Sequence, residues 1–280
     1  MEFSKYEATG NDFIMIDGLS DERRLSADLI RKLCDRRRGI GADGVIVMSP
    51  SSISDLRMQV FNADGGEAEM CGNGIRALFL FAMDRGVLSG GGIEVETGAG
   101  ARPVEFGGIC GDETVFTVDM GEPAYLRADI PMDGPPDEEA IGIEVPLDGQ
   151  ALEATCVSMG NPHCVVFVEN AAAHPVAEIG AKVENHALFP QRTNVEFVEV
   201  RDTERLVVRV WERGVGETLA CGTGACASLV ASRLNQKCGD RATVIVPGGP
   251  LEVRWEDGPV FLTGPARHVY DGMIEVAEEI

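Results

Sequence analysis

The sequence predicts an α+β protein of two pseudo-symmetric domains, each a central helix surrounded by mixed β-sheet. Three observations support this prediction. Four sequence blocks recur in the second half of the chain at one constant offset. In each half, a strand pattern runs into a glycine-rich turn and then into a stretch that is apolar on almost every side. The other segments are short, rich in β-branched residues and separated by turn residues, as strands are.

The duplication is visible as an offset of 150 residues, the difference between Cys71 and Cys221. Four blocks share this offset without a gap, which chance does not readily produce. They are Thr9–Ile16 with Met159–Val166, Gly44–Val47 with Asn194–Phe197, Phe61–Gly74 with Trp211–Gly224, and Ile75–Met83 with Ala225–Arg233. We therefore expect two copies of one domain, each with its own core.

Each block predicts one element of the domain. Thr9–Ile16 is a glycine turn that leads into a buried strand, and Leu56–Asn62 is a strand that runs into the long glycine-rich turn. Ile75–Met83 is apolar nearly all round, as a buried central helix is. Further strands are predicted at Glu94–Thr97, Val115–Asp119, Arg205–Glu212 and Ala242–Val246.

Residues 1–119 are expected to form the first repeat and residues 120–266 the second, with the closing segment 267–280 returning to the first. The segment Met120–Gly149 is rich in Pro, Gly and Asp, which suits a crossover and a loop-rich approach to the second repeat. A pseudo-twofold relation between the repeats predicts an active site in the interdomain cleft, because such clefts commonly bind ligands.

The composition indicates a globular protein and excludes two kinds of partner. The hydrophobic fraction is 44% and the charged fraction 25%. A net charge of −22 without a basic stripe excludes a nucleic-acid partner. No apolar run reaches the roughly 18 residues of a membrane span, and the N-terminus lacks a secretory signal pattern. We therefore expect a cytoplasmic protein with no membrane or nucleic-acid partner.

Eight cysteines require an interpretation, and a reducing cytoplasm would keep them as thiols. Paired CxxC spacings are absent, so the sequence predicts no metal site. Six cysteines are expected to be small buried hydrophobic residues, namely Cys34, Cys110, Cys156, Cys164, Cys226 and Cys238. Cys71 and Cys221 differ from them because they occupy the same position in the two repeats.

Cys71 and Cys221 each begin a Cys-Gly-x-Gly turn directly before a predicted central helix. Glycines there permit positive φ and a close approach of ligand to backbone. The first N–H groups of a helix have no partner within it and lie at the positive end of its dipole. They can bind a carboxylate, and we expect them to stabilise a thiolate and lower the cysteine pKa from about 8.5 toward neutrality.

Two thiols facing one another across a cleft predict a specific reaction. One thiolate removes the α-proton of an amino acid, and the other thiol delivers a proton to the opposite face, which inverts the configuration. The helix N-termini stabilise the carbanion, whose charge spreads into the carboxylate. Coupled titration of the pair gives one thiol and one thiolate. No lysine lies in a glycine-rich phosphate-binding segment, so no pyridoxal phosphate site is predicted.

Several motifs resemble those of the diaminopimelate epimerase family. They are Thr9–Phe13, Arg38–Gly44, Phe61–Gly65, Met159–Cys164, Glu212–Gly214 and Ala220–Ala225. The similarity extends from Lys5 to His268–Gly272, nearly the whole chain. It implies an isomerase without a cofactor that interconverts LL- and meso-2,6-diaminopimelate in lysine and peptidoglycan-precursor biosynthesis. It also implies two domains with central helices and a homodimer.

The resemblance also implies the site residues. Cys71 and Cys221 would be the catalytic pair, and His163 and Glu212 would adjust their pKa values. The reacting carboxylate would be bound by Gly72, Asn73, Gly222 and Thr223. The amino groups and the distal carboxylate would be bound by Asn11, Asn62, Asn161, Asn194, Glu212 and Arg213. The planar fork of Arg213 suits a carboxylate. Tyr270 would lie at the dimer contact.

Two other functions stay open on the sequence alone. A proline or hydroxyproline racemase shares the fold and the paired cysteines, although its small apolar substrate needs fewer donors than Asn62, Asn194 and Arg213 provide. A thiol redox or metal-binding module would need the two cysteines within about 6 Å at Cα, or additional zinc ligands. Taken singly, Asn11 would be an ordinary turn residue and His163 a core histidine.

Overall fold

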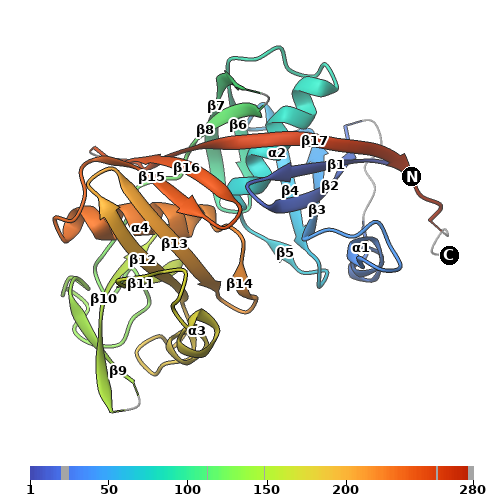
Figure 1. The fold of residues 1–280 in the computed structure, drawn as a ribbon. Helices are drawn as coiled ribbons and strands as arrows, with labels where there is room; N and C mark the ends of the chain where they lie inside the picture. The colour runs from blue at the N-terminus through green and yellow to red at the C-terminus, as the bar shows by residue number, and fades with distance from the viewer. Residues whose placement is uncertain (20–24, 112, 148, 257, 277–280) are drawn as a thin grey trace. The chain divides into compact units, whose positions relative to one another are not determined.

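The computed structural model describes residues 1–19, 25–111, 113–147, 149–256 and 258–276 (Figure 1). Within these ranges the chain forms two compact units. The first consists of Met1–Val118 together with the segment that begins at Gly264, and the second is Asp119–Thr263.

The first unit is a mixed sheet with a buried helix. Its elements are β1 (Glu2–Ala8), β2 (Asn11–Asp17), α1 (Ala27–Cys34), β3 (Gly44–Ser49), β4 (Leu56–Asn62), β5 (Glu67–Ala68), α2 (Gly72–Asp84), β6 (Gly92–Thr97), β7 (Gly100–Cys110) and β8 (Glu113–Asp119). Strand β2 is parallel to β3, and β4 is parallel to β6, whereas the pairs β1–β2, β3–β4, β6–β7 and β7–β8 are antiparallel. Because parallel neighbours need a crossover, α1 and α2 lie in the two connections between parallel strands.

The second unit has the same plan. Its elements are β9 (Ile143–Leu147), β10 (Gln150–Ser158), β11 (Pro162–Phe167), α3 (Val176–Glu184), β12 (Asn194–Asp202), β13 (Arg205–Glu212), β14 (Gly216–Thr218), α4 (Gly222–Leu234), β15 (Arg241–Val246) and β16 (Gly249–Arg254). The last strand, β17 (Phe261–Met273), pairs with β16 through residues 261–263 and with β1 from Arg267 onward. The parallel pairs are β11–β12 and β13–β15, with α3 and α4 in their crossovers.

Helices α2 and α4 are the cores of their units. Every residue of α2 from Gly72 to Ala82 is buried, and the helix contacts β1, β2, β3, β4 and β7. Helix α4 contacts β10, β11, β12, β13, β15 and β16. A helix enclosed by sheet must be apolar all round, which explains the sequence of both stretches. Among the described residues, no helix is both long enough and apolar enough to cross a membrane.

The two units repeat one another in register as well as in order. In the first unit Phe13 lies opposite Gly44 in the parallel pair β2–β3, and in the second His163 lies opposite Asn194 in β11–β12. These partners keep the offset found in the sequence. The predicted α+β fold of two duplicated domains, each with a central helix, is therefore confirmed.

The segment from residue 120 to 149, expected to be loop-rich, also contains strand β9, which pairs with β10. One expectation needs correction. Cys110 is exposed rather than buried, because it ends β7 at the tip of the β7–β8 hairpin, opposite Glu113. Cys238 is only partly buried, whereas Cys34, Cys156, Cys164 and Cys226 are buried as expected.

The packing of α3 on β13 gives a test of the fold. A Cβ added to Gly180 would lie 2.6 Å from the Trp211 Cβ atom, closer than real Cβ contacts. We expect Gly180→Ala to lower the free energy of unfolding by about 1–3 kcal/mol, despite the better helix propensity of alanine. Gly239→Ala is the control, because a Cβ there meets nothing within 4 Å. Urea unfolding measures both, and equal stability of the two variants would contradict the packing described.

Candidate functional site

Cys71 is the N-cap residue of α2. Its backbone is extended, with φ −142° and ψ 109°, and its Sγ atom accepts the Gly74 N–H at 3.3 Å. A cap in this conformation satisfies one of the free N–H groups of the first helical turn. A Cβ at Gly74 would lie 2.7 Å from the Cδ1 atom of Ile46, which explains the glycine. The sulfur is thus held at the positive end of the helix.

Cys221 is held in the same way at the start of α4. Its backbone has φ −123° and ψ 117°, and its Sγ atom accepts the Gly224 N–H at 3.4 Å. A Cβ at Gly224 would lie 2.8 Å from the Oε1 atom of Glu196. Each of the two predicted cysteines therefore caps the central helix of its own unit.

The surroundings of Cys221 overturn one expectation. Burial raises the pKa of the Cys221 thiol well above its ordinary value, and the carboxylates of Glu212 and Glu196 raise it further. Hydrogen bonds from Thr223 and Gly224 act in the opposite direction but are outweighed. The expected shift toward neutrality is therefore wrong for Cys221. The helix end supplies only about half a charge, which is less than burial and two carboxylates remove.

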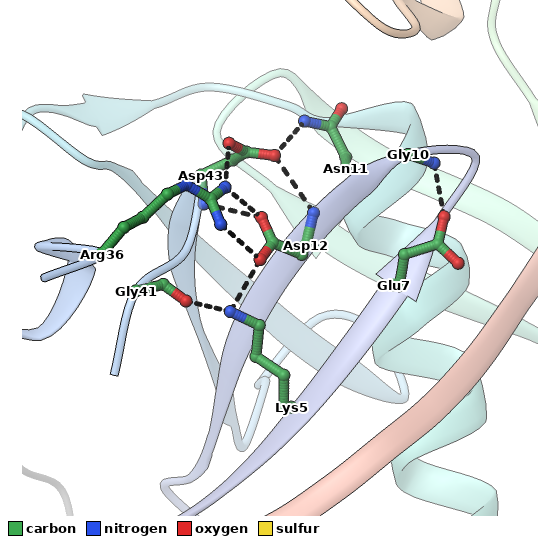
Figure 2. A network of polar contacts seen from close by, with 8 residues as sticks. All are labelled: Lys5, Glu7, Gly10, Asn11, Asp12, Arg36, Gly41 and Asp43. Carbon is green, nitrogen blue, oxygen red and sulfur yellow. Dashed lines mark hydrogen bonds and ion pairs between the residues drawn. The ribbon is translucent and has the colours of Figure 1, made fainter. Parts of the chain in front are cut away.

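Asn11 and Asn73 are brought together beside Cys71. The Asn73 amide donates to Asn11 Oδ1 at 2.7 Å, and the Asn11 amide donates to Asp43 at 3.0 Å. Figure 2 shows that the same Asp43 carboxylate also accepts the Asp12 N–H and receives the Arg36 guanidinium. The orientation of Asn11 is therefore set by an acidic residue that directly precedes β3.

An ion network supports this arrangement (Figure 2). Arg36 contacts Asp12 at 2.6 Å and Asp43 at 2.7 Å, and Lys5 contacts Asp12 at 2.7 Å. Burial alone would raise the pKa of Asp12, but the bonds from Arg36 and Lys5 hold it well below its ordinary value. Asp12 is therefore ionised at neutral pH.

Arg76 is fully buried in α2 and also fixes Asn73. Its guanidinium donates to Asn73 Oδ1 at 2.9 Å, to Thr9 Oγ1 at 2.8 Å and to the Gly72 carbonyl at 3.0 Å. A planar donor with several N–H groups suits this set of oxygens. Since Asn73 receives Arg76 on its oxygen, its amide group is directed to Asn11.

Asn161 and Thr223 form the corresponding pair beside Cys221. The Asn161 amide donates to Thr223 Oγ1 at 3.3 Å, and this hydroxyl lies 3.4 Å from Cys221 Sγ. On its other side, Asn161 Oδ1 lies 3.0 Å from His163 Nε2. His163 in turn meets Glu196 at 2.7 Å, and both side chains are fully buried.

The remaining residues of the second unit cluster at the ends of β12 and β13. Asn194 donates to the Pro162 carbonyl at 2.9 Å and accepts the Arg213 N–H at 2.9 Å. Arg213 donates to the Gln191 carbonyl at 3.3 Å. Glu212 accepts the Thr218 hydroxyl at 2.5 Å, and its charge raises the pKa of Cys221.

Two predicted residues of the first unit lie apart from these contacts. Asn62 is exposed at the end of β4, where its backbone closes a turn with Gly65 and Gly66. Tyr270 lies on β17, partly exposed and edge-to-face with Phe3. Within the described ranges, no group of three or more His, Cys, Asp or Glu side chains is arranged to hold a metal ion.

Comparison with known proteins identifies the family. A family model described as diaminopimelate epimerase matches residues 3–126 and 155–269. A diaminopimelate epimerase of Synechococcus elongatus is 49% identical over 286 residues, which covers 99% of this chain and 99% of that protein. Another, from Leptospira biflexa, is 45% identical over 278 residues, with the same coverage of both. The chain belongs to the diaminopimelate epimerase family.

Two solved structures with this fold are more distant in sequence. A phenazine biosynthesis protein of the PhzF family from Bacillus anthracis matches with a TM-score of 0.71 at 18% identity, covering 99% of both chains. A hydroxyproline epimerase from Agrobacterium vitis, solved with trans-4-hydroxy-L-proline, also matches with a TM-score of 0.71, at 14% identity over 98% of this chain and 90% of that one. At such identities the likeness shows the fold alone.

Three residues with close contacts to the site were not predicted from the sequence. They are Asp43, Arg76 and Glu196. Asp43 lies inside a motif that was recognised, but Arg76 and Glu196 stand in apolar stretches where a single charge is easily taken for an exposed one. A charged residue inside a stretch that must be buried is the feature that could have identified them, because such a charge needs a partner.

The raised pKa of Cys221 predicts its reactivity. A higher pKa keeps the thiol protonated to higher pH, so the alkylation rate of Cys221 by iodoacetamide should reach its midpoint at a higher pH than that of an unperturbed thiol. A short cysteine peptide in the same buffers is the reference, because an unperturbed cysteine has a pKa of about 8.5. Peptide mass spectrometry across a pH series measures both. A Cys221 midpoint at or below that of the reference peptide would contradict the electrostatics described.

Proposed function

We propose that this protein interconverts LL- and meso-2,6-diaminopimelate by proton transfer at one α-carbon. The observation that carries the proposal is the repeated N-cap. In a chain of the diaminopimelate epimerase family, Cys71 and Cys221 take the same backbone conformation and accept the same N–H bond in their two repeats. Two equivalent thiols suit a reaction that needs a base on one face of a carbon and an acid on the other.

The chemistry requires one thiolate and one thiol. The thiolate takes the α-proton, the electron pair of the C–H bond passes into the substrate carboxylate, and the thiol then protonates the opposite face. Free N–H groups at Gly72 and Gly222, with the side chains of Asn73 and Thr223, would stabilise the negative charge that develops on this carboxylate. At the end of a turnover the protonation states of the two sulfurs are exchanged.

The unequal surroundings of the sulfurs support an assignment of roles. Burial and two carboxylates favour the protonated form of Cys221. Cys221 would therefore be the acid in the resting enzyme, and Cys71 the base. His163 and Glu212 resemble residues that adjust the pKa values of the two thiols. Both belong to the same unit as Cys221.

The distal half of the substrate needs donors and acceptors for a second amino acid group. We assign Asn11, Asn62, Asn161, Asn194, Glu212 and Arg213 to this task. Asn194 already holds the backbone of Arg213, so it also positions that guanidinium. An arginine can bind the distal carboxylate with two parallel hydrogen bonds.

A substrate comparison in D₂O tests the proposed function. Incubation with LL-diaminopimelate should place deuterium at an α-carbon and yield the meso isomer, whereas L-proline should remain unlabelled. Mass spectrometry and chiral chromatography follow both substrates. Exchange on proline without exchange on diaminopimelate would instead favour the racemase alternative.

Removal of either thiol should stop turnover. Cys71→Ala and Cys221→Ala are each expected to lower the epimerisation rate by about 100-fold or more, because each leaves one face of the carbon without its proton donor or acceptor. Cys110→Ala is the matched control and should keep the full rate, since Cys110 is exposed on a hairpin. Near-normal turnover in either single variant at the N-caps would rule out a two-thiol mechanism.

We also propose a cytoplasmic homodimer. The cysteines are thiols rather than disulfides, which suits a reducing compartment. Three apolar side chains on β17, Val269, Tyr270 and Met273, are 52%, 43% and 80% exposed. Neighbouring exposed apolar residues on one strand are typical of a surface that a partner covers.

The dimer proposal predicts the effect of one charge on this strand. Tyr270→Asp should shift the protein toward monomer, because it places a carboxylate in an apolar contact. Ile109→Asp, at a residue 74% exposed on β7, is the control and should leave the mass unchanged. Sedimentation equilibrium measures the mass. An unchanged dimer in the Tyr270 variant, or a monomeric wild-type protein, would contradict the proposal.

A further inference from the structure

A fully buried acid–base pair lies beneath the N-terminus of α4. His163 Nδ1 and Glu196 Oε1 are 2.7 Å apart, and neither side chain is exposed. The duplication gives the equivalent positions in the first unit, Phe13 and Ile46, which are both apolar. The pair is therefore not required by the fold, because the same place in the other repeat is filled by hydrocarbon.

The pair begins a chain of hydrogen bonds that ends at the catalytic sulfur. From Glu196 Oε1 to His163 Nδ1 the distance is 2.7 Å, and from His163 Nε2 to Asn161 Oδ1 it is 3.0 Å. Asn161 Nδ2 lies 3.3 Å from Thr223 Oγ1, which lies 3.4 Å from Cys221 Sγ. All five residues belong to the second unit.

The donors and acceptors of these residues fix the direction of each hydrogen bond between His163 and Cys221. Asn161 Oδ1 can only accept, so the proton of that bond belongs to His163 Nε2. The Asn161 amide then donates to Thr223 Oγ1, and the hydroxyl proton of Thr223 remains available for Cys221 Sγ. The bond between His163 and Glu196 carries one further proton. With the chain in this direction, a Cys221 thiolate receives an O–H donor.

The Glu196 carboxylate makes its hydrogen bond to His163. Its Oε2 atom is buried and has no hydrogen-bond partner among the described residues. Its Oε1 atom lies 2.8 Å from where a Cβ on Gly224 would be, so only glycine leaves room for the carboxylate. Burial of a carboxyl group with one oxygen unpaired is costly, and such a cost calls for a functional reason.

In the first repeat, the hydrogen bond equivalent to the one between Asn161 and Thr223 has its donor and acceptor exchanged. There Asn11 accepts from Asn73 at 2.7 Å and donates to Asp43 at 3.0 Å. Asn11 therefore accepts a hydrogen bond from Asn73, whereas Asn161 donates one to Thr223, the equivalent residue of the second repeat. The carboxylate that orients the asparagine is Asp43 in one repeat and Glu196, through His163, in the other.

We propose that Glu196 is a positioning residue, which acts through His163 to keep the Asn161 amide directed at Thr223 and the Thr223 hydroxyl proton directed at Cys221. The inference rests on the proposed function of Cys221. In that reaction Cys221 is a thiolate after each protonation of substrate, and the donated O–H stabilises it at that moment. No proton leaves the chain, because only the orientation of its donors matters.

Glu196 also acts on Cys221 as a nearby charge, and two variants that both remove this charge separate the two effects. The charged groups that face Cys221 are Glu212 from β13 and Glu196 from β12, with His163 from β11 against Glu196. If Glu196 acts by charge alone, Glu196→Gln and Glu196→Ile lower the pH midpoint of Cys221 alkylation equally. If it also acts through the hydrogen-bond chain, the midpoint of Glu196→Ile stays above that of Glu196→Gln, because only the Gln amide donates to Nδ1 and keeps the proton on Nε2.

A double-mutant cycle tests whether Glu196 acts through His163. The variants are Glu196→Ile, His163→Phe and the two combined, and the combination recreates the apolar pair of the first repeat, so we expect it to fold. Glu196→Ile should lower the epimerisation rate about 10-fold, as expected for one lost hydrogen bond to a charged group. In the His163→Phe background it should have no further effect. Glu196→Gln should retain most of the activity.

The matched control is Glu199→Ile. Glu199 is a buried carboxylate on the same strand, bound to Arg201 and to the Ala171 N–H. It should lower stability without moving the Cys221 midpoint. Additive effects of the His163 and Glu196 changes, or equal downward shifts for both Glu196 variants, would overturn the proposal. The pH midpoint of Cys221 alkylation is measured without turnover. A wild-type protein that lacks epimerase activity would therefore refute the proposed function but not the hydrogen-bond chain from Glu196 to Cys221.

Discussion

The bond from a backbone N–H in the first turn of a helix to a cysteine sulfur is the interaction on which the site depends. It occurs twice, from Gly74 to Cys71 and from Gly224 to Cys221. The cap needs an extended residue at the end of a turn, followed by a helix that the sheet encloses. Glycine is required at the donor because a Cβ would meet Ile46 or Glu196. The buried helix and the strands around it thus hold a sulfur at the helix end in each unit.

A duplicated frame alone would give two identical thiols, whereas the surroundings of these two thiols differ. The difference comes from residues that do not follow the repeat. Beside Cys71 the fixed groups are the Asn73–Asn11 contact and the buried guanidinium of Arg76. Beside Cys221 they are buried or partly buried carboxylates, which raise the pKa of its thiol. Each repeat therefore holds its sulfur in the same cap geometry but beside different charged groups.

Much of the fold was predictable, because the duplication is visible in the sequence and a helix surrounded by sheet must be apolar all round. The register of Phe13 with Gly44 and of His163 with Asn194 keeps that offset. The electrostatics were less predictable. The helix end was expected to lower the pKa of Cys221, but burial and carboxylates distant in sequence outweigh it. Glu196 is a single charge in an apolar strand, and its position alone does not show that His163 is its partner.

If two different thiols serve the two faces of one α-carbon, solvent deuterium enters the product and not the substrate. The distribution of deuterium at early times therefore distinguishes two bases from one. When LL-diaminopimelate is converted in D₂O, the meso product should carry deuterium at the inverted carbon while the recovered LL substrate carries none, because the base that takes a proton does not return a solvent deuteron to the same face. Deuterium appearing in recovered substrate as fast as in product would show that a single base serves both faces, and would contradict the account.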